Sequence, residues 1–244
     1  MKPTPKLNQS ATALSIRTKS IYLLPQRFYA IQLVLLVLFG LLFLWFSRSE
    51  TLDMTLSRAW FDPITQQFPW KDSHWLDLIN HRLLKYLVIA IGVVVLFKGV
   101  IRRQPLLILV ALLIGVGALA VGVLKISSAH SCPWDLVEFG GKAVSYPLLS
   151  HTPLNSGPGR CFPGGHASSG FSLMALFFLF WPQRPKLAWC CWFAAVVLGL
   201  LMGFGQVMRG AHFLSHNLWA GWWVWLAQLL TFGCVSYLLN RKRK

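Results

Sequence analysis

Three short polar segments, each beside an apolar run, carry the residues of this chain that are best suited to acid–base or nucleophilic chemistry. The segments are residues 125–135, 160–166 and 209–216. They hold histidines, whose imidazole titrates near neutral pH and can act as a proton donor, a proton acceptor or a nucleophile. They also hold lysine and arginine, which bind anions. We interpret the three segments as parts of one site that handles phosphate.

The second segment ends in Pro-Gly-Gly-His, directly before an apolar run. Gly164 and Gly165 allow the backbone to turn sharply, and the exposed amides at the N-terminus of a helix bind anions. His166 would then stand beside the bound anion, where it could donate a proton. The alternative is a loop-to-helix turn in which His166 only caps the helix.

The third segment contains two histidines with the spacing of one helical turn. His212 and His216 are four residues apart and would share a face of a helix. Arg209 precedes His212 by three residues and could make a bidentate contact to phosphate. In the first segment, Lys125 ends an apolar run, where its ammonium group could bind a phosphate oxygen. The alternative for Lys125 is a side chain that only extends towards the membrane surface.

The elements that must position these segments are apolar enough to cross a bilayer. Of the 244 residues, 55% are hydrophobic and 12% are charged, whereas about 25% of residues are charged in a soluble domain. Spanning a hydrocarbon core of about 30 Å takes about 20 residues of helix. Six apolar runs approach that length: residues 28–46, 83–100, 105–125, 167–182, 187–206 and 217–239. We therefore predict an all-α polytopic integral membrane helix bundle with six transmembrane helices, of which the fourth is short and starts inside the bundle.

The basic residues indicate the orientation of the bundle. The leader, the second and fourth connections and the tail contain Lys and Arg but no acid, while all seven acidic residues lie in the other connections. Short loops rich in Lys and Arg stay in the cytoplasm. We expect cytoplasmic termini and a site on the outer face, which is the periplasmic face of a bacterial inner membrane. The net charge of +16 then reflects topology, and no motif indicates a nucleic-acid partner.

One membrane domain, residues 28–240, makes up most of the chain. A basic leader at 1–27, expected to be partly disordered, precedes it, and a basic tail at 241–244 follows. The outward loop 47–82 is rich in aromatic residues, which favours amphipathic segments at the membrane surface that either cap the bundle or gather lipid. The outward loop 126–166 carries most of the first two polar segments.

The three segments resemble the signature motifs of the type-2 phosphatidic acid phosphatase superfamily, which includes lipid phosphate phosphatases and vanadium-dependent haloperoxidases. The first motif of the family is Lys, six residues and Arg-Pro, which here becomes Lys125, six residues and Cys132-Pro133. The second motif is Pro-Ser-Gly-His, and here it is Pro-Gly-Gly-His at 163–166. The third is Ser-Arg, five residues, His, three residues and Asp. The resemblance covers about residues 83–239.

The resemblance implies a metal-independent phosphatase, without a cofactor, that acts on a lipid phosphate or diphosphate at the outer leaflet. His212 would attack phosphorus and form a phosphohistidine, and His166 would protonate the leaving oxygen. Lys125 and the amides around Gly164 and Gly165 would hold the phosphoryl oxygens. This division of roles agrees with phosphoryl transfer in general, which depends mostly on positioning and electrostatics.

The chain departs from the family pattern at both motif arginines. With the third motif aligned on His212, Cys132 and Gln206 occupy the two arginine positions. Arg160 and Arg209 lie inside the same segments and could supply the missing cations from new positions. Gln206 would remain as a neutral contact to the phosphate.

The same alignment places His216 where the family has the aspartate that orients the nucleophile. A neutral imidazole can accept that hydrogen bond but does not stabilise an imidazolium as an anion does. Asp135 is a candidate substitute. Cys132 and Cys161 both lie in the outward loop, one in each of two motifs, and an oxidising periplasm would favour a disulfide between them, contributing on the order of 3 kcal/mol.

Other functions remain open at this point. His166, His212 and His216 are enough imidazoles for a catalytic zinc ion. The protein could also pass the phosphoryl group to another lipid, or bind or move phospholipid without catalysis. The sequence does not select among undecaprenyl diphosphate, lipid A phosphate, phosphatidylglycerol phosphate and phosphatidic acid as substrates, and it leaves the oligomeric state open.

Overall fold

The computed structural model describes residues 20–241, apart from the side chain at position 81. The predictions for the leader before position 20 and for the tail after position 241 lie outside these residues. Within the described part of the chain every long element is a helix, and extended backbone pairs only in isolated bridges. The predicted all-α class is confirmed.

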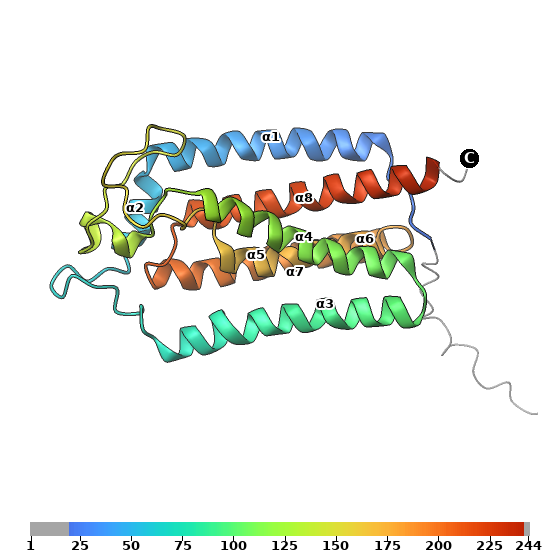
Figure 1. The fold of residues 1–244 in the computed structure, drawn as a ribbon, viewed down its shortest axis with the longest axis horizontal. Helices are drawn as coiled ribbons and strands as arrows, with labels where there is room; N and C mark the ends of the chain where they lie inside the picture. The colour runs from blue at the N-terminus through green and yellow to red at the C-terminus, as the bar shows by residue number, and fades with distance from the viewer. Residues whose placement is uncertain (1–19, 242–244) are drawn as a thin grey trace, which may run out of the picture.

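Five helical segments of the described chain are long and apolar enough to cross a membrane. They are α1 (Gln26–Ser49), α4 (Pro105–Ser127), α7 (Pro185–Met208), α8 (Leu214–Arg241), and α3 (Leu84–Ile101) with the π-helical segment η1 (Leu76–Leu83) that precedes it. Figure 1 shows them side by side in one bundle, in which α8 contacts α1, α4 and α7. Proline occupies the first position of both α4 and α7, where its missing N–H costs nothing.

The predicted fourth span is a broken helix in the centre of the bundle. It consists of α5 (Gly165–Ser172), the 3₁₀ turn η4 (Leu173–Ala175) and α6 (Leu176–Phe180). At about 1.5 Å per residue, it falls short of a hydrocarbon core of about 30 Å. Phe177 and Phe178 are fully buried, as expected for a segment enclosed by α4, α7 and α8. The prediction of a short fourth helix that starts inside the bundle agrees with this arrangement.

The polar end of the bundle holds α2 (Thr51–Arg58) and the long connection between α4 and α5 (Figure 1). The last described residue, Arg241 at the end of α8, lies at the opposite end. Two 3₁₀ turns, η2 (Pro133–Asp135) and η3 (Val137–Phe139), shape the connection.

A separate small hydrophobic cluster closes the polar end. Its buried members are Phe68, Leu136, Phe139, Ala143 and Phe213. Phe68 comes from the aromatic loop that follows α2, and its ring centroid lies 5.4 Å from that of Phe139. Trp70 and Trp75 of the same loop remain exposed. The loop was expected either to cap the bundle or to gather lipid, and the buried packing of Phe68 favours the cap.

Candidate active site

The tight turn between α7 and α8 positions His212. The amides of Ala211 and His212 donate to the carbonyl of Gln206, at 2.9 and 3.3 Å. Gly210 has a φ of 70°, which favours glycine, and a Cβ atom there would collide with the ring of Phe68. The turn leaves His212 only 3% exposed.

The start of α5 lies against the start of α8. The amide of Gly164 donates to the carbonyl of His216 at 2.8 Å, and a Cβ atom on Gly164 would collide with Asn217 Oδ1. This contact brings His166, the second residue of α5, to the same end of the bundle as His212. The amide of Gly164 was predicted to bind a phosphoryl oxygen, and this prediction is wrong for the structure described, because that N–H donates to the carbonyl of His216.

Lys125 completes this arrangement from the last turn of α4. A Cβ atom on Gly165 would lie 3.6 Å from Lys125 Nζ, so the ammonium group stands at the N-terminus of α5. The first amides of a helix have no acceptor inside the helix, and they favour an anion there. We call Lys125, His166 and His212, with this N-terminus, the basic cluster.

The pKa of His212 reflects both its burial and this charge. Burial is the largest cause that lowers the pKa well below the ordinary value, and the basic side chains of Lys125, His216 and His166 lower it further. The backbone of Cys161 acts in the opposite direction. His212 is therefore neutral at neutral pH, as a nucleophilic imidazole must be.

Cys132 and Cys161 form a disulfide that lies directly on the histidine. Cys161 Sγ is 3.2 Å from Nδ1 of His212 and 3.1 Å from the carbonyl oxygen of Ala211. The pairing of the two cysteines was a hypothesis from the sequence, but the contact with His212 was not foreseen. No local spacing links position 161 to position 212.

The zinc alternative finds no support in the geometry. Among the described residues, the metal-ligating atoms grouped within 4.8 Å of one another belong to Cys132, Cys161 and His212. The two sulfurs are bonded to each other and are not thiolates, which are the form that binds zinc. The three histidines considered from the sequence do not form such a group.

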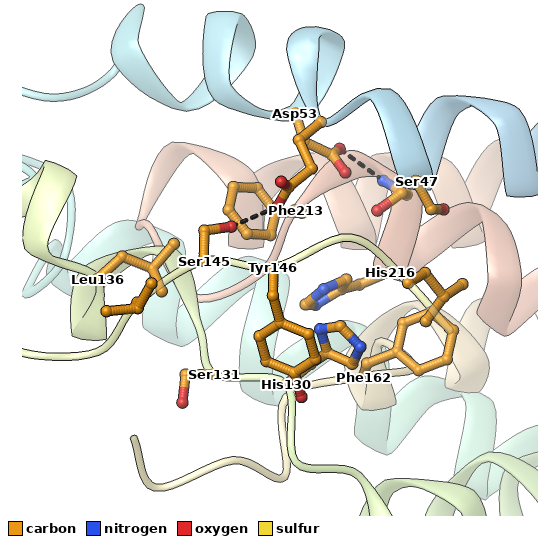
Figure 2. Close-up of a pocket in the computed structure, with 14 residues that line it drawn as sticks. Ser47, Asp53, His130, Ser131, Leu136, Ser145, Tyr146, Phe162, Phe213 and His216 are labelled. Atoms are coloured by element: carbon orange, nitrogen blue, oxygen red, sulfur yellow. Dashed lines mark hydrogen bonds between the residues drawn. The ribbon is translucent and has the colours of Figure 1, made fainter. Parts of the chain in front are cut away.

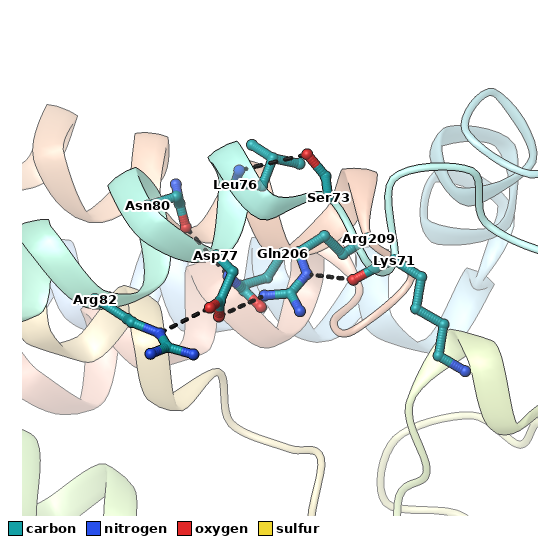
Figure 3. Close-up of polar contacts among 8 residues, drawn as sticks. All are labelled: Lys71, Ser73, Leu76, Asp77, Asn80, Arg82, Gln206 and Arg209. Carbon is teal, nitrogen blue, oxygen red and sulfur yellow. Dashed lines mark hydrogen bonds and ion pairs between the residues drawn. The ribbon is translucent and has the colours of Figure 1, made fainter.

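Arg209 and Gln206 point towards η1 and the loop before it (Figure 3). Arg209 Nε donates to the carbonyl of Lys71 at 2.9 Å, and Nη1 lies 4.0 Å from the carboxylate of Asp77. Gln206 Nε2 donates to Asn80 Oδ1 at 3.1 Å. Both side chains were predicted to contact phosphate, and in this structure both contact protein groups instead.

Arg160 and Asp135 occupy the long connection. The amide of Arg160 donates to the carbonyl of Ser128 at 2.7 Å, which places its exposed side chain near the end of α4. Asp135 Oδ2 accepts from the amide of Cys132 at 3.3 Å, so this carboxylate caps η2. Burial raises the pKa of Asp135. The carboxylate considered as an orienting acid thus serves the turn that carries Cys132.

A second polar region, which we call the acidic cavity, adjoins the basic cluster at His216. Its volume is about 30 Å³, enough for one or two water molecules. Figure 2 shows His216 between Asp53, from α2, and His130 with Tyr146, from the long connection. Glu50 accepts a hydrogen bond from Ser145 in the same cavity. His216 is 4% exposed, and its Nδ1 has no hydrogen-bond partner among the described residues.

Asp53 and His130 of the acidic cavity have displaced pKa values. Burial raises the pKa of Asp53 to about 6, although its Oδ1 accepts from the amide of Ser215 at 2.9 Å. Burial lowers the pKa of His130, whose ring stacks on Tyr146 with 4.2 Å between centroids. No role for Glu50, Asp53 or His130 was predicted from the sequence. The one available signal was the position of two acids directly after the first apolar run.

A family comparison agrees with this site. The model of the PAP2 superfamily matches residues 105–240, which is more than half of the chain and includes all three polar segments. The chain belongs to the PAP2 superfamily. The resemblance inferred from the three motifs is confirmed, and membership supports a multi-pass membrane phosphatase that acts on lipid phosphate.

One solved structure resembles this PAP2 protein along most of its length. It is the crystal structure of the first transmembrane PAP2 type phosphatidylglycerolphosphate phosphatase from Bacillus subtilis. The two chains are 20% identical, with a TM-score of 0.48, and the match covers 86% of this chain and 97% of that chain. No curated protein matches the sequence.

Proposed function

We propose that this PAP2 protein hydrolyses a phosphomonoester or diphosphate of a lipid at the outer leaflet, through a phosphohistidine at His212. The observation that carries the proposal is the basic cluster itself. A neutral, nearly buried imidazole lies beside the ammonium group of Lys125, a second histidine and the N-terminus of α5.

The reaction has two steps in this proposal. A nitrogen of His212 attacks phosphorus while His166 gives a proton to the leaving lipid oxygen, and water then attacks the phosphohistidine with His166 as the base. Lys125 and the first amides of α5, those of Gly165 and His166, stabilise the negative charge on the phosphoryl oxygens. No metal ion is required in either step.

The fold supports the proposed orientation, with both termini in the cytoplasm and the site in the periplasm of a bacterial inner membrane. The basic cluster joins the end of α4, the start of α5 and the turn before α8 at the polar end of the bundle, and α8 ends at the opposite side (Figure 1). Exposed Lys142 in the long connection and exposed Arg184 before α7 mark the two ends. In a background with Cys190, Cys191 and Cys234 changed to Ser, Lys142→Cys should react with an impermeant maleimide in intact spheroplasts and Arg184→Cys should not. The reverse pattern would refute the orientation.

The activity is tested with purified protein, in the presence of a chelator, on the four candidate lipids. We expect phosphate release from at least one of undecaprenyl diphosphate, lipid A phosphate, phosphatidylglycerol phosphate and phosphatidic acid, and an acid-labile phosphoryl-enzyme after rapid quenching. His212→Ala should abolish both signals, whereas His151→Ala, an exposed histidine of the long connection, is the matched control. Equal activity of the wild type and His212→Ala would refute the proposal. A second lipid added as acceptor separates hydrolysis from transfer to lipid.

A further inference from the structure

The disulfide contacts the proposed nucleophile on one side of its ring. Cys161 is fully buried and its Sγ lies 3.2 Å from Nδ1 of His212. Sγ of Cys132, bonded to it, also lies within 4.8 Å of a ring nitrogen of His212. The carbonyl oxygen of Ala211 lies 3.1 Å from the same sulfur.

The chemistry of the sulfur restricts the protonation of the ring. A sulfur in a disulfide carries no hydrogen, so it can accept a weak hydrogen bond but cannot donate one. In a neutral imidazole one nitrogen carries the hydrogen and the other the lone pair. The contact is favourable when the hydrogen is on Nδ1, and the lone pair is then on Nε2, at the far side of the ring from the sulfur.

The groups expected to orient His212 do not make this contact. The rings of His212 and His216 are 5.9 Å apart between centroids in an edge-to-face arrangement, and Nδ1 of His216 lacks a hydrogen-bond partner. The carboxylate of Asp135 accepts from the amide of Cys132. Cys161 Sγ, in contrast, lies at hydrogen-bond distance from Nδ1 of His212.

We propose that the Cys132–Cys161 disulfide replaces the aspartate of the PAP2 motif as the group that orients the nucleophile. Cys161 holds His212 as the tautomer with hydrogen on Nδ1, so that Nε2 attacks phosphorus, and Cys132 keeps Cys161 free of hydrogen. Both cysteines are positioning residues. The inference rests on the proposed function for its catalytic part, but the tautomer itself does not depend on any substrate.

The proposal makes catalysis dependent on the oxidation state of the protein. A dithiol reductant donates two electrons and two protons to the S–S bond, which gives two thiols, while the reductant is oxidised to its own disulfide. The thiol of Cys161 can donate a hydrogen bond to Nδ1, which favours the tautomer with hydrogen on Nε2. In that tautomer Nε2 has no free lone pair with which to attack phosphorus. The enzyme is then fully active only after exposure to an oxidising compartment.

The test measures the tautomer and the rate on the same protein. In purified protein labelled with ¹⁵N-histidine, long-range ¹H–¹⁵N spectra identify which nitrogen of His212 carries hydrogen, with His212→Ala assigning the signals. We expect hydrogen on Nδ1 in the oxidised protein. After reduction, or in Cys132→Ser, we expect hydrogen on Nε2 and a kcat lower by about tenfold with KM little changed. A chelator is present because the reduced residues have the spacing of a metal site.

A matched control separates this disulfide from the other cysteines. The variant with Cys190, Cys191 and Cys234 changed to Ser, which removes the free cysteines, should respond to reduction as the wild type does. Thermal melting shows whether the reduced protein is folded at the assay temperature. If it is not, the tautomer of the oxidised protein alone decides the inference.

Two results would overturn the inference. One is hydrogen on Nε2 in the oxidised protein, and the other is a folded reduced protein with unchanged tautomer and unchanged kcat. If the oxidised protein shows hydrogen on Nδ1 but releases no phosphate from any lipid, the proposed function fails and the orienting role of the disulfide stands. The two failures are therefore distinguishable.

Discussion

The basic cluster and the acidic cavity are neighbouring polar regions at the same end of the bundle, and they differ in the sign of their charge. The side chains that lower the pKa of His212 are those of Lys125, His166 and His216, all of them basic. In contrast, the cavity beside His216 is lined by the carboxyl groups of Glu50 and Asp53. Phosphate is attracted to the first region and repelled by carboxylates in the second.

This difference in charge gives different surroundings to His212 and His216, although their spacing in the sequence places both on one face of a helix. His212 belongs to the basic cluster, and His216 faces the acidic cavity, where Asp53 caps the first turn of α8 through the amide of Ser215. Asp53 of the cavity therefore supports the helix that follows His212, while the cluster is the region that we propose binds the substrate. Charge and hydrogen bonding, rather than residue type, distinguish the two roles.

The largest expected effect comes from replacing each of the two histidines by alanine, one at a time. His212→Ala removes the proposed nucleophile and should lower kcat by at least about 1,000-fold. His216→Ala removes a ring that packs on Phe162 and Phe213, and it should lower kcat by only about tenfold. Steady-state phosphate release checks both. Equal losses would show that the two regions act as one site.

Lys125→Ala should lower kcat/KM by about 100-fold, because the variant removes the ammonium group at the N-terminus of α5. Lys142→Ala removes an exposed lysine of the long connection and serves as the control. The measurement is the initial rate as a function of lipid concentration in mixed micelles. A loss of kcat/KM for Lys125→Ala no greater than that of the control would show that Lys125 does not act on the substrate.

Asp53 should make stability depend on pH. Its pKa of about 6 in the folded protein exceeds the ordinary value of 3.8, so the folded protein binds more protons between these values. The free energy of unfolding should then fall, by on the order of 3 kcal/mol, as pH rises from about 4 to about 6, and stay constant above that range. Asp53→Asn keeps an acceptor for the amide of Ser215 and should flatten the profile. The melting temperature in detergent, measured from pH 4 to 7, checks this, and identical profiles for both proteins would contradict it.

The smallest expected effect belongs to Arg209. Its guanidinium group binds the carbonyl of Lys71 and faces the carboxylate of Asp77, so Arg209→Ala should change KM by less than about threefold. The same kinetic assay checks it. A loss of tenfold or more would show that this arginine leaves Asp77 and reaches the phosphate when substrate binds.

Much of the fold and the centre of the site were predictable because both depend on local patterns. Apolar length predicted the long helices, since a helix must satisfy its backbone inside a bilayer. Motif spacing predicted Lys125, His166 and His212, which the structure brings to one end of the bundle. The contacts of Arg209 and Gln206 were not predictable in the same way, because they depend on how η1 and the loop before it pack against α7.

The contacts that distinguish this chain join residues far apart in the sequence. Gln206 donates a hydrogen bond to Asn80, and the amide of Ser215 donates one to Asp53. The sulfur of Cys161 contacts the ring of His212. The order of residues established a membrane bundle with three phosphate motifs, because hydrophobic length and short spacing act within one segment. The packing of helices and loops determined which side chain faces Nδ1 of His212 and which region holds the acids, because those contacts form only when separate segments are buried against one another.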